Sequence, residues 1–235
     1  MSHPTLSHRY AIYYAPHEDS QFHQLASRWL GRDAITGELE EPNLPASISR
    51  EAWRAATEDP RHYGFHATLK PPFQLANGAS SEALKASLEK IAVQHVAFTL
   101  PPLRLGALGH FLALILSEPS PTLHQLADDC VRDLDCFRAP SDAADLAKRM
   151  RPSHSVAEQQ NLIRWGYPYV LDTWKFHMTL TNSLKPKELE LFRSHLAQRF
   201  AEMCRQPMRC DSICLFEEAS PGAPLHLTAR FSLGQ

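Results

Sequence analysis

Short apolar runs alternate with amphipathic stretches along the chain, and this pattern predicts a mixed fold of strands and helices. Strands are expected at 10–15, 65–69, 96–105, 111–116, 174–181, 210–217 and 225–233. Helices are expected at 19–30, 49–57, 81–94, 121–135 and 186–203. In the third helix, Leu84, Leu88 and Ile91 recur at helical spacing, which is typical of one buried face.

Turn residues divide these elements. Pro71-Pro72 is expected to end the strand at 65–69, because proline cannot donate to a sheet hydrogen bond. A turn at Gly106/Gly109 is expected to join the next two strands. The remaining stretches, 32–62 outside its short helix and 136–160, lack a clear period and are expected to be irregular, as is the aromatic loop 165–169.

The two halves of the chain share the same order of elements. The string His-Gln-Leu-Ala at 23–26 recurs at 124–127, and Phe-His-x-Thr-Leu at 65–69 recurs at 176–180. Chance similarity between short segments is the alternative, and the matching order of elements argues against it. We therefore expect one α+β domain over 1–235, bilobal, built from duplicated β-α-β-α-β units at about 9–109 and 110–235. Mostly antiparallel sheets would line a central cleft, with the helices outside.

The repeated five-residue motif has one apolar and one polar face, because side chains alternate across a strand. The polar face of the first copy carries His66 and Thr68, and that of the second carries His177 and Thr179. A third, shorter match at His226 lacks the flanking Phe and Leu, and we expect it to lie outside any site. The alternative is that the paired histidines are half-buried structural residues.

Two imidazoles and two hydroxyls suit phosphate-ester cleavage. Histidine titrates near neutrality, so one ring can remove a proton from the attacking oxygen while the other protonates the leaving oxygen. Threonine hydroxyls can donate hydrogen bonds to the non-bridging oxygens, where negative charge accumulates. This chemistry requires no metal and no cofactor, and carboxylate clusters for a divalent metal are not evident in the sequence.

Composition and charge limit the binding partners and the cellular location that can be expected. The net charge is −2, with 24 Lys and Arg against 26 Asp and Glu, so no global basic field favours duplex DNA. Five cysteines without a Cys-x-x-Cys pair argue against a disulfide framework or a zinc site. The polar N-terminus and the short apolar runs predict neither a signal peptide nor a membrane span. We expect a cytoplasmic monomer.

From residue 9 to residue 233 the chain resembles the two-histidine (2H) phosphoesterase superfamily, which is named for paired His-x-Thr/Ser motifs. The strings at 63–73 and 165–169 resemble one branch, uncharacterised proteins associated with phosphonate-degradation gene clusters. The superfamily resemblance implies metal-free action on cyclic phosphates, with His66 and His177 catalytic and Thr68 and Thr179 holding the phosphate. The branch resemblance implies a link to phosphonate metabolism, with a ribose cyclic phosphate as substrate.

Five further side chains are candidates for substrate binding. Alternation places Lys70 and Lys175 on the polar faces, although a lysine at a strand end is more often solvated. Tyr63 precedes the first motif, and Tyr167 and Tyr169 precede the second. These aromatic rings either stack on substrate or pin their loops to the core.

Two functions remain open at this point. One is a cyclic phosphodiesterase acting on a small phosphorylated substrate, such as a cyclic nucleotide or sugar phosphate, with RNA ends as a further class. The other is a catalytically inactive module that binds nucleotides or RNA ends. Both His-x-Thr motifs are intact, which favours the enzyme. The substrate, the direction of reaction and the division of acid and base roles stay undetermined.

Overall fold

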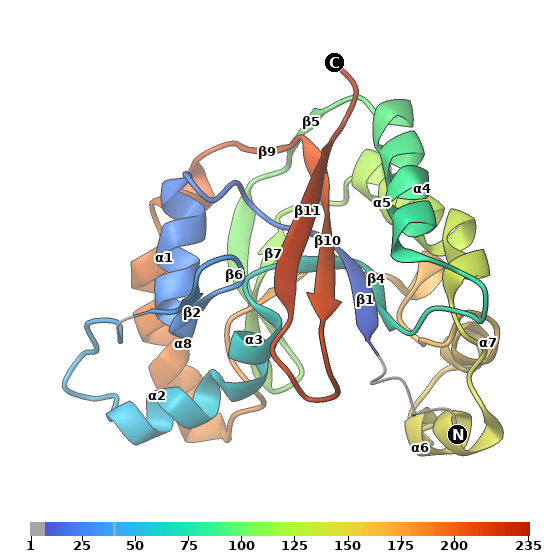
Figure 1. Ribbon diagram of the computed structural model, residues 1–235. Coiled ribbons are helices and arrows are strands. Elements are labelled where there is room, and N and C mark those ends of the chain that lie inside the picture. Colours follow the sequence, from blue (N-terminus) through green and yellow to red (C-terminus); the bar gives the residue numbers. More distant parts are fainter. Residues whose placement is uncertain (1–7, 40) are drawn as a thin grey trace.

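The fold centres on one seven-stranded sheet, in a computed structural model that describes residues 8–39 and 41–235 (Figure 1). Each neighbouring pair of strands is antiparallel. In order across the sheet the strands are β11 (His226–Ser232), β10 (Ser212–Glu218), β1 (Arg9–Tyr14), β4 (Ala67–Phe73), β8 (Met178–Thr179), β7 (Phe111–Leu116) and β6 (Leu103–Leu108). The predicted α+β class with mostly antiparallel pairing is confirmed.

Helices and two small strand pairs complete the described chain. The helices are α1 (Gln21–Leu30), α2 (Arg50–Ala56), α3 (Glu58–Tyr63), α4 (Ser81–Gln94), α5 (Pro121–Asp133), α6 (Ala143–Arg149), α7 (Val156–Trp165) and α8 (Pro186–Phe200). The small pairs are β2 (Arg32–Asp33) with β3 (Gly37–Glu38), and β5 (Phe98–Leu100) with β9 (Met208–Cys210). Short 3-10 turns lie at Asp135–Phe137, Leu171–Thr173 and Met203–Arg205.

The sheet order places corresponding strands of the two chain halves at mirrored positions. The two motif strands, β4 and β8, are neighbours at the centre, and β1 and β7 flank them on either side. Strand β6 ends the first half of the chain but pairs with β7 of the second half. Strand β10 belongs to the second half but pairs with β1 of the first. The pairing of β4 with β8 joins these strands into one continuous sheet; the division into two repeats stays a prediction.

The main core lies on one face of the sheet. Tyr10, Ile12, Leu69 and Met178 belong to it and are almost fully buried. Helices α1 and α8 lie on one side of this core and α4 and α5 on the other (Figure 1). The opposite face carries a smaller apolar cluster that includes Tyr13, and it leaves the motif residues half-buried. The apolar and polar faces predicted for the motif strands are thus the core face and the site face of the sheet.

Several boundaries differ from the sequence predictions. Strand β4 runs through Pro71 and Pro72 instead of ending before them, because its partner β8 pairs with it only at Ala67 and requires no further donors. The predicted strand at 174–181 is reduced to β8. Pro101-Pro102 splits the predicted strand at 96–105 into β5 and β6.

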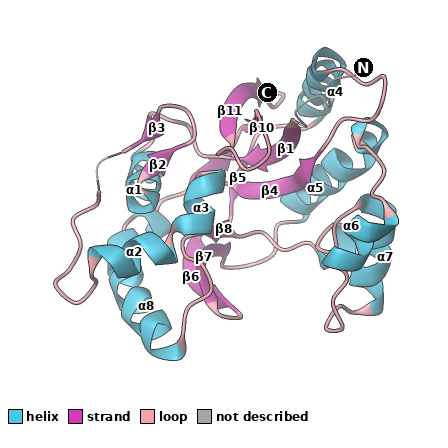
Figure 2. Ribbon diagram, turned by 60° about the horizontal axis from the view of Figure 1, so that its bottom comes forward, coloured by secondary structure: helices cyan, strands magenta, loops and turns pink. Residues whose placement is uncertain are grey.

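Three helices lie in stretches that were expected to be irregular. These are α3, α6 and α7. Helix α7 begins with a reciprocal capping box between Ser155 and Glu158, and it ends at Gly166 in the left-handed conformation. Those capping signals are present in the sequence. The helix was not predicted, because the apolar residues between the two signals are only weakly periodic. Figure 2 shows α3 beside the central strands and α6 and α7 together at one end of the molecule.

Candidate active site

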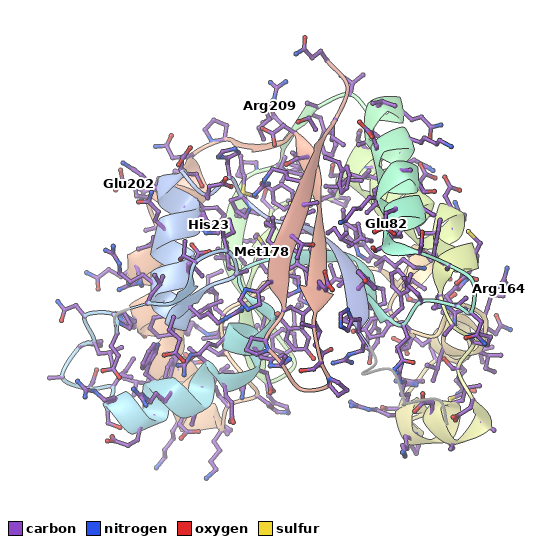
Figure 3. The ribbon with its side chains drawn as sticks, viewed as in Figure 1. His23, Glu82, Arg164, Met178, Glu202 and Arg209 are labelled. Carbon is purple, nitrogen blue, oxygen red and sulfur yellow. The ribbon has the colours of Figure 1, made fainter. Side chains whose placement is uncertain are left out.

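Strands β4 and β8 bring the two motifs side by side. Ala67 lies opposite Met178, so the central residues of the two motifs are paired; Met178 is labelled near the middle of the molecule in Figure 3. Continued by one residue in each direction, this antiparallel register sets His66 across from Thr179 and His177 across from Thr68. All four are half-buried on the site face.

The two histidines are therefore diagonal neighbours on one face of an antiparallel pair. Such residues have Cα atoms roughly 7–8 Å apart, and long side chains reach across that gap. A tetrahedral phosphate placed above this square of residues can meet an imidazole on each side and a hydroxyl beside each imidazole. The arrangement supplies the groups that an in-line displacement at phosphorus requires.

Both imidazoles are oriented in the same way by their own backbone. The Nδ1–H of His66 donates to the carbonyl of Gly64 at 2.9 Å, and that of His177 donates to the carbonyl of Lys175 at 2.8 Å. A carbonyl only accepts, so Nδ1 carries the proton in each ring and Nε2 is left as the reactive nitrogen. The hydroxyl of Thr68 lies 3.3 Å from Nε2 of His66. Each motif thus presents one basic nitrogen, and in the first motif a hydroxyl lies beside it.

Burial makes both histidines weak bases in the unliganded protein. It lowers the pKa of His66 to about 4; the hydrogen bond to Gly64 opposes this shift, and the charge of His177 adds to it. Burial also lowers the pKa of His177. At pH 7 both rings are therefore neutral until a ligand changes their surroundings.

A cavity of about 230 Å³ opens beside the histidines. His66 and Thr179 line it together with Tyr63 of α3 and Phe111 of β7. His177 and Thr68 are not among its lining residues, but the ring of Phe111 lies 6.0 Å from that of His177. The cavity therefore reaches the site from the His66 side, and Phe111 lies between its lining and His177.

Tyr13 was missed by the sequence predictions. Its ring stacks on His66, with centroids 3.7 Å apart and planes inclined by 20°. Burial raises the pKa of its hydroxyl, so the ring remains neutral. No sequence signal marked this residue, because β1 is apolar on both faces and only the register of β1 on β4 sets Tyr13 opposite Thr68.

The three candidate tyrosines lie at different distances from the histidines. The ring of Tyr63 is 6.2 Å from that of His66. Tyr167 is half-buried, and burial raises the pKa of its hydroxyl. Tyr169 packs against Tyr167 at 5.7 Å and is 41% exposed. Tyr63 thus borders the site, and substrate contact by any of the three stays a prediction.

The two candidate lysines do not join the histidine site. Lys70 is 2% exposed on the core side of β4, where its ammonium donates to the carbonyl of Val131 at 3.1 Å. An irregularity in the β1–β4 register beside Ile12 shifts the alternation there, so the predicted placement of Lys70 on the polar face is wrong. The exposed side chain of Lys175 lines a separate cavity, next to Trp174. At the histidine site Lys175 contributes its carbonyl.

The residues of the third, shorter motif lie away from these groups. His226 is exposed at the start of the edge strand β11, and β10 and β1 separate that strand from β4. Thr228 donates its hydroxyl to the carbonyl of Leu215 at 3.3 Å. The paired motifs are brought together and the third is not.

Neither a metal-binding cluster nor a membrane-spanning helix occurs in residues 8–39 and 41–235. Within these ranges no group of three or more His, Cys, Asp or Glu residues is placed to hold a metal ion. In the same part of the chain no helix is long and apolar enough to cross a membrane.

The chain is similar to solved structures and to curated proteins. Among solved structures, Escherichia coli LigT with NADP+ gives a TM-score of 0.44 at 14% identity, and LigT with ATP gives 0.44 at 13%. Both alignments cover 97% of this chain and 99% of LigT. Among curated proteins, "Ribose 1,5-bisphosphate phosphokinase PhnN" of Janthinobacterium sp. (strain Marseille) is 37% identical over 221 residues, and the protein of that name from Laribacter hongkongensis is 35% identical over 225.

The curated relatives are longer than this protein. The alignments cover 92% and 93% of this chain but 49% and 50% of the relatives, so the chain spans about half their length. The profile of a family described as "Protein of unknown function (DUF1045)" matches residues 68–226. That segment contains Thr68 and the whole second motif, and it makes up more than half of the chain. The chain belongs to the DUF1045 family.

Proposed function

We propose that this protein is a phosphoric diester hydrolase that opens cyclic phosphate esters with His66 and His177 as paired base and acid. The observation that carries the proposal is the register of β4 on β8, which sets both His-x-Thr motifs on one face with their imidazoles held in the same tautomer. The inactive binding module is the weaker candidate, because binding alone does not require two imidazoles held in the same tautomer.

The reaction uses one water and no other reactant. The oxygen of water bonds to phosphorus while the bond from phosphorus to one ester oxygen breaks. Nε2 of one histidine takes the proton from water, and Nε2–H of the other gives its proton to the departing oxygen. The hydroxyls of Thr68 and Thr179 donate to the non-bridging oxygens. The product is a phosphate monoester with a free hydroxyl, and proton transfer through solvent resets the two rings.

The histidine that acts as the acid becomes protonated when the substrate binds. Both rings are neutral in the unliganded protein at pH 7, since burial lowers both pKa values. A bound phosphodiester is an anion, and an anion beside an imidazole favours its charged form. Substrate binding therefore raises the pKa of the histidine that becomes the acid.

This coupling predicts a difference between two pH profiles. In the free protein the state with one neutral and one charged histidine is most populated below pH 6.5, so kcat/KM should peak there and fall through neutrality. The profile of kcat reports the substrate complex and should peak at higher pH. Steady-state rates between about pH 4 and 9 measure both. A kcat/KM that still rises at pH 7.5 would contradict the lowered pKa values. The limbs belong to the coupled pair and do not assign its members.

The substrate class we infer is a nucleoside 2′,3′-cyclic or a ribose cyclic phosphate. The curated relatives are named for ribose 1,5-bisphosphate, and this supports a phosphorylated ribose. The chain contains no Gly-x-x-x-x-Gly-Lys-Ser/Thr phosphate loop, so we assign the phosphokinase activity in that name to the half of the relatives that this chain does not cover. Together with the resemblance to proteins of phosphonate-degradation clusters, this supports a role in phosphonate metabolism.

Chelation tests the metal-independent part of the proposal. Two imidazoles and two hydroxyls without a carboxylate make a poor divalent-metal site, so EDTA should leave the rate unchanged. The measurement is product formation from 2′,3′-cyclic nucleotides, RNA ends and 5-phosphoribosyl 1,2-cyclic phosphate, each with and without EDTA. Activity that disappears in EDTA and returns with one particular metal would overturn this mechanism.

A further inference from the structure

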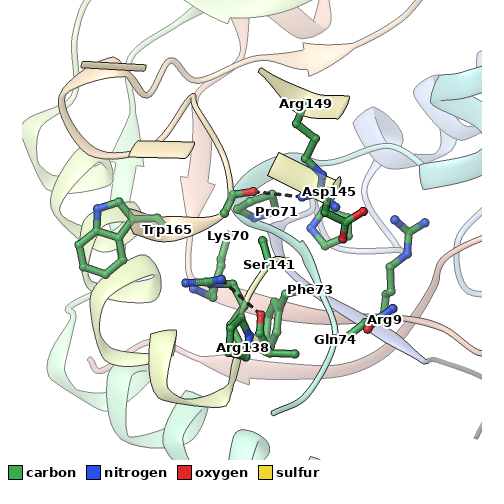
Figure 4. Close-up of a pocket in the computed structure, with 14 residues that line it drawn as sticks. Arg9, Lys70, Pro71, Phe73, Gln74, Arg138, Ser141, Asp145, Arg149 and Trp165 are labelled. Carbon is green, nitrogen blue, oxygen red and sulfur yellow. Dashed lines mark hydrogen bonds between the residues drawn. The ribbon is translucent and has the colours of Figure 1, made fainter. Parts of the chain in front are cut away.

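A second, strongly basic pocket lies at the end of β4 away from the histidines. We call it the basic pocket; four cationic side chains and one acidic side chain line it (Figure 4). They are Arg9, Lys70, Arg138, Arg149 and Asp145. Its volume is about 80 Å³. A site for one water needs roughly 10–15 Å³, so this space holds a group the size of phosphate but not a nucleobase.

The carboxylates around the basic pocket are too few to neutralise its cations. Asp135 lies 3.9 Å from the ammonium of Lys70 and 2.8 Å from the guanidinium of Arg138, and it also pairs with Arg164 at 3.1 Å. Asp135 is thus shared by Lys70, Arg138 and the neighbouring Arg164, and Arg9 pairs with Glu218. Arg149 donates to the carbonyl of Gly166 at 3.1 Å, and within residues 8–39 and 41–235 it forms no ion pair with a carboxylate. The surplus charge and the buried ammonium favour an anionic ligand.

The basic pocket borders the site face. On β1, Arg9 and Tyr13 share one face by alternation and lie roughly 13 Å apart along the strand. Tyr13 stacks on His66, so this face of β1 connects the pocket with the first histidine. Tyr167 directly follows Gly166 of the pocket in the chain, and its ring packs against that of Tyr169. The pocket and His66 therefore lie on the same side of β1, and an arginine side chain reaching toward His66 shortens the span that one phosphorylated sugar has to bridge.

We propose that the basic pocket binds a second phosphate group of the substrate whose cyclic phosphate lies between His66 and His177. The inference rests on the proposed function and narrows the substrate class to cyclic phosphate esters that carry another phosphate. Arginine suits this role, because its planar guanidinium can donate two parallel hydrogen bonds to phosphate oxygens. The segment that supplies Arg138 and Arg149 lies between α5 and α7, outside both His-x-Thr motifs.

The test compares two substrates that differ only in the second phosphate. They are adenosine 2′,3′-cyclic phosphate and the same compound with a 5′-phosphate. Wild type should show at least about tenfold higher kcat/KM for the 5′-phosphorylated compound. Arg149→Met should remove most of that preference. It should change kcat/KM for adenosine 2′,3′-cyclic phosphate by less than about twofold. Arg149 is exposed on α6, so this change spares the core. Arg9 is a poorer target, because it pairs with the fully buried Glu218.

Two further variants separate charge from structure. Lys148→Met removes a neighbouring exposed charge that does not line the pocket and should change neither rate. Asp145→Asn removes the acidic lining residue and should raise kcat/KM for the 5′-phosphorylated compound about two- to fivefold. An effect of Arg149→Met on both compounds alike, or a wild type without preference, would overturn the proposal. The latter result is also expected if only free phosphate occupies the pocket.

Binding distinguishes failure of this inference from failure of the proposed function. Ribose 5-phosphate has no cyclic ester, so its calorimetric affinity does not depend on catalysis. One outcome is that Arg149→Met binds ribose 5-phosphate about fivefold or more weakly than wild type does, while neither cyclic compound is hydrolysed. That outcome would support phosphate binding in the basic pocket and contradict the proposed hydrolase activity. Hydrolysis with no dependence on Arg149 in either assay would keep the hydrolase and reject the pocket.

Discussion

Replacing either His66 or His177 by alanine is expected to lower kcat by roughly 10²–10⁴-fold, the usual contribution of a positioned acid or base. Each change removes one of the two Nε2 atoms that the fixed tautomers expose. Neither histidine lies in the main apolar core, so the variants should remain folded. The measurement is kcat on a confirmed substrate, with circular dichroism to verify folding. Turnover near wild type in either variant would remove the two-histidine mechanism.

His226→Ala is the matched control for this experiment. Its histidine is also followed by x-Thr, but it lies on the edge strand, so its loss should change kcat by less than about twofold. Equal losses for His226→Ala and His66→Ala would show that the wrong histidines were chosen. Replacing Thr68 or Thr179 by valine should cost less than losing an imidazole, because each hydroxyl supplies one neutral hydrogen bond.

Substrates with different leaving groups separate the acid from the base. Loss of the acid should matter less when the departing oxygen is already stable as an anion. Loss of the base should affect all substrates to a similar degree, because each requires activation of the same water. Comparing His66→Ala with His177→Ala across such a series assigns the roles that the pH profile leaves open.

The sequence predicted the site face because strand alternation is a local property. Burial of Ala67 and Met178 beside half-buried His66 and His177 follows from the two motifs alone. That the motif strands are direct neighbours did not follow, because register depends on contacts far apart in the chain. The duplicated order of elements hinted at a symmetric arrangement, but it did not reveal that each half contributes a strand to the other half's side of the sheet.

The failures have specific physical causes. Alternation misplaced Lys70 because a register irregularity beside Ile12 turns its side chain toward the core, and no sequence pattern marks a bulge of this kind. Tyr13 was overlooked because an aromatic ring in an apolar strand carries no signal of which face it occupies. The sequence did not predict the basic pocket, because the segment that forms α6 has no clear helical period. The cations of the pocket lie together only in the folded chain, where this segment lies against the end of β4.

Gly64→Ala is expected to destabilise the protein and to impair catalysis together. Gly64 has φ 77° and ψ 174°, a region that is essentially restricted to glycine, so a side chain there costs about 1–3 kcal/mol. An added Cβ would also lie 2.7 Å from Cβ of Ala34. At about 2–4 °C per kcal/mol for a chain of this size, Tm should fall by roughly 2–12 °C. Thermal unfolding followed by circular dichroism measures the shift.

The catalytic part of this effect follows from the Gly64 carbonyl, which accepts the Nδ1–H of His66 and so orients its Nε2. A displaced backbone would misplace that nitrogen, and kcat should fall by about tenfold or more even where the protein is folded. Gly78→Ala is the control, because Gly78 also has a positive φ of 83° but has open space around it. Its replacement should lower Tm only modestly and leave kcat unchanged. Equal kcat values in the two variants would show that the Gly64 carbonyl does not position His66.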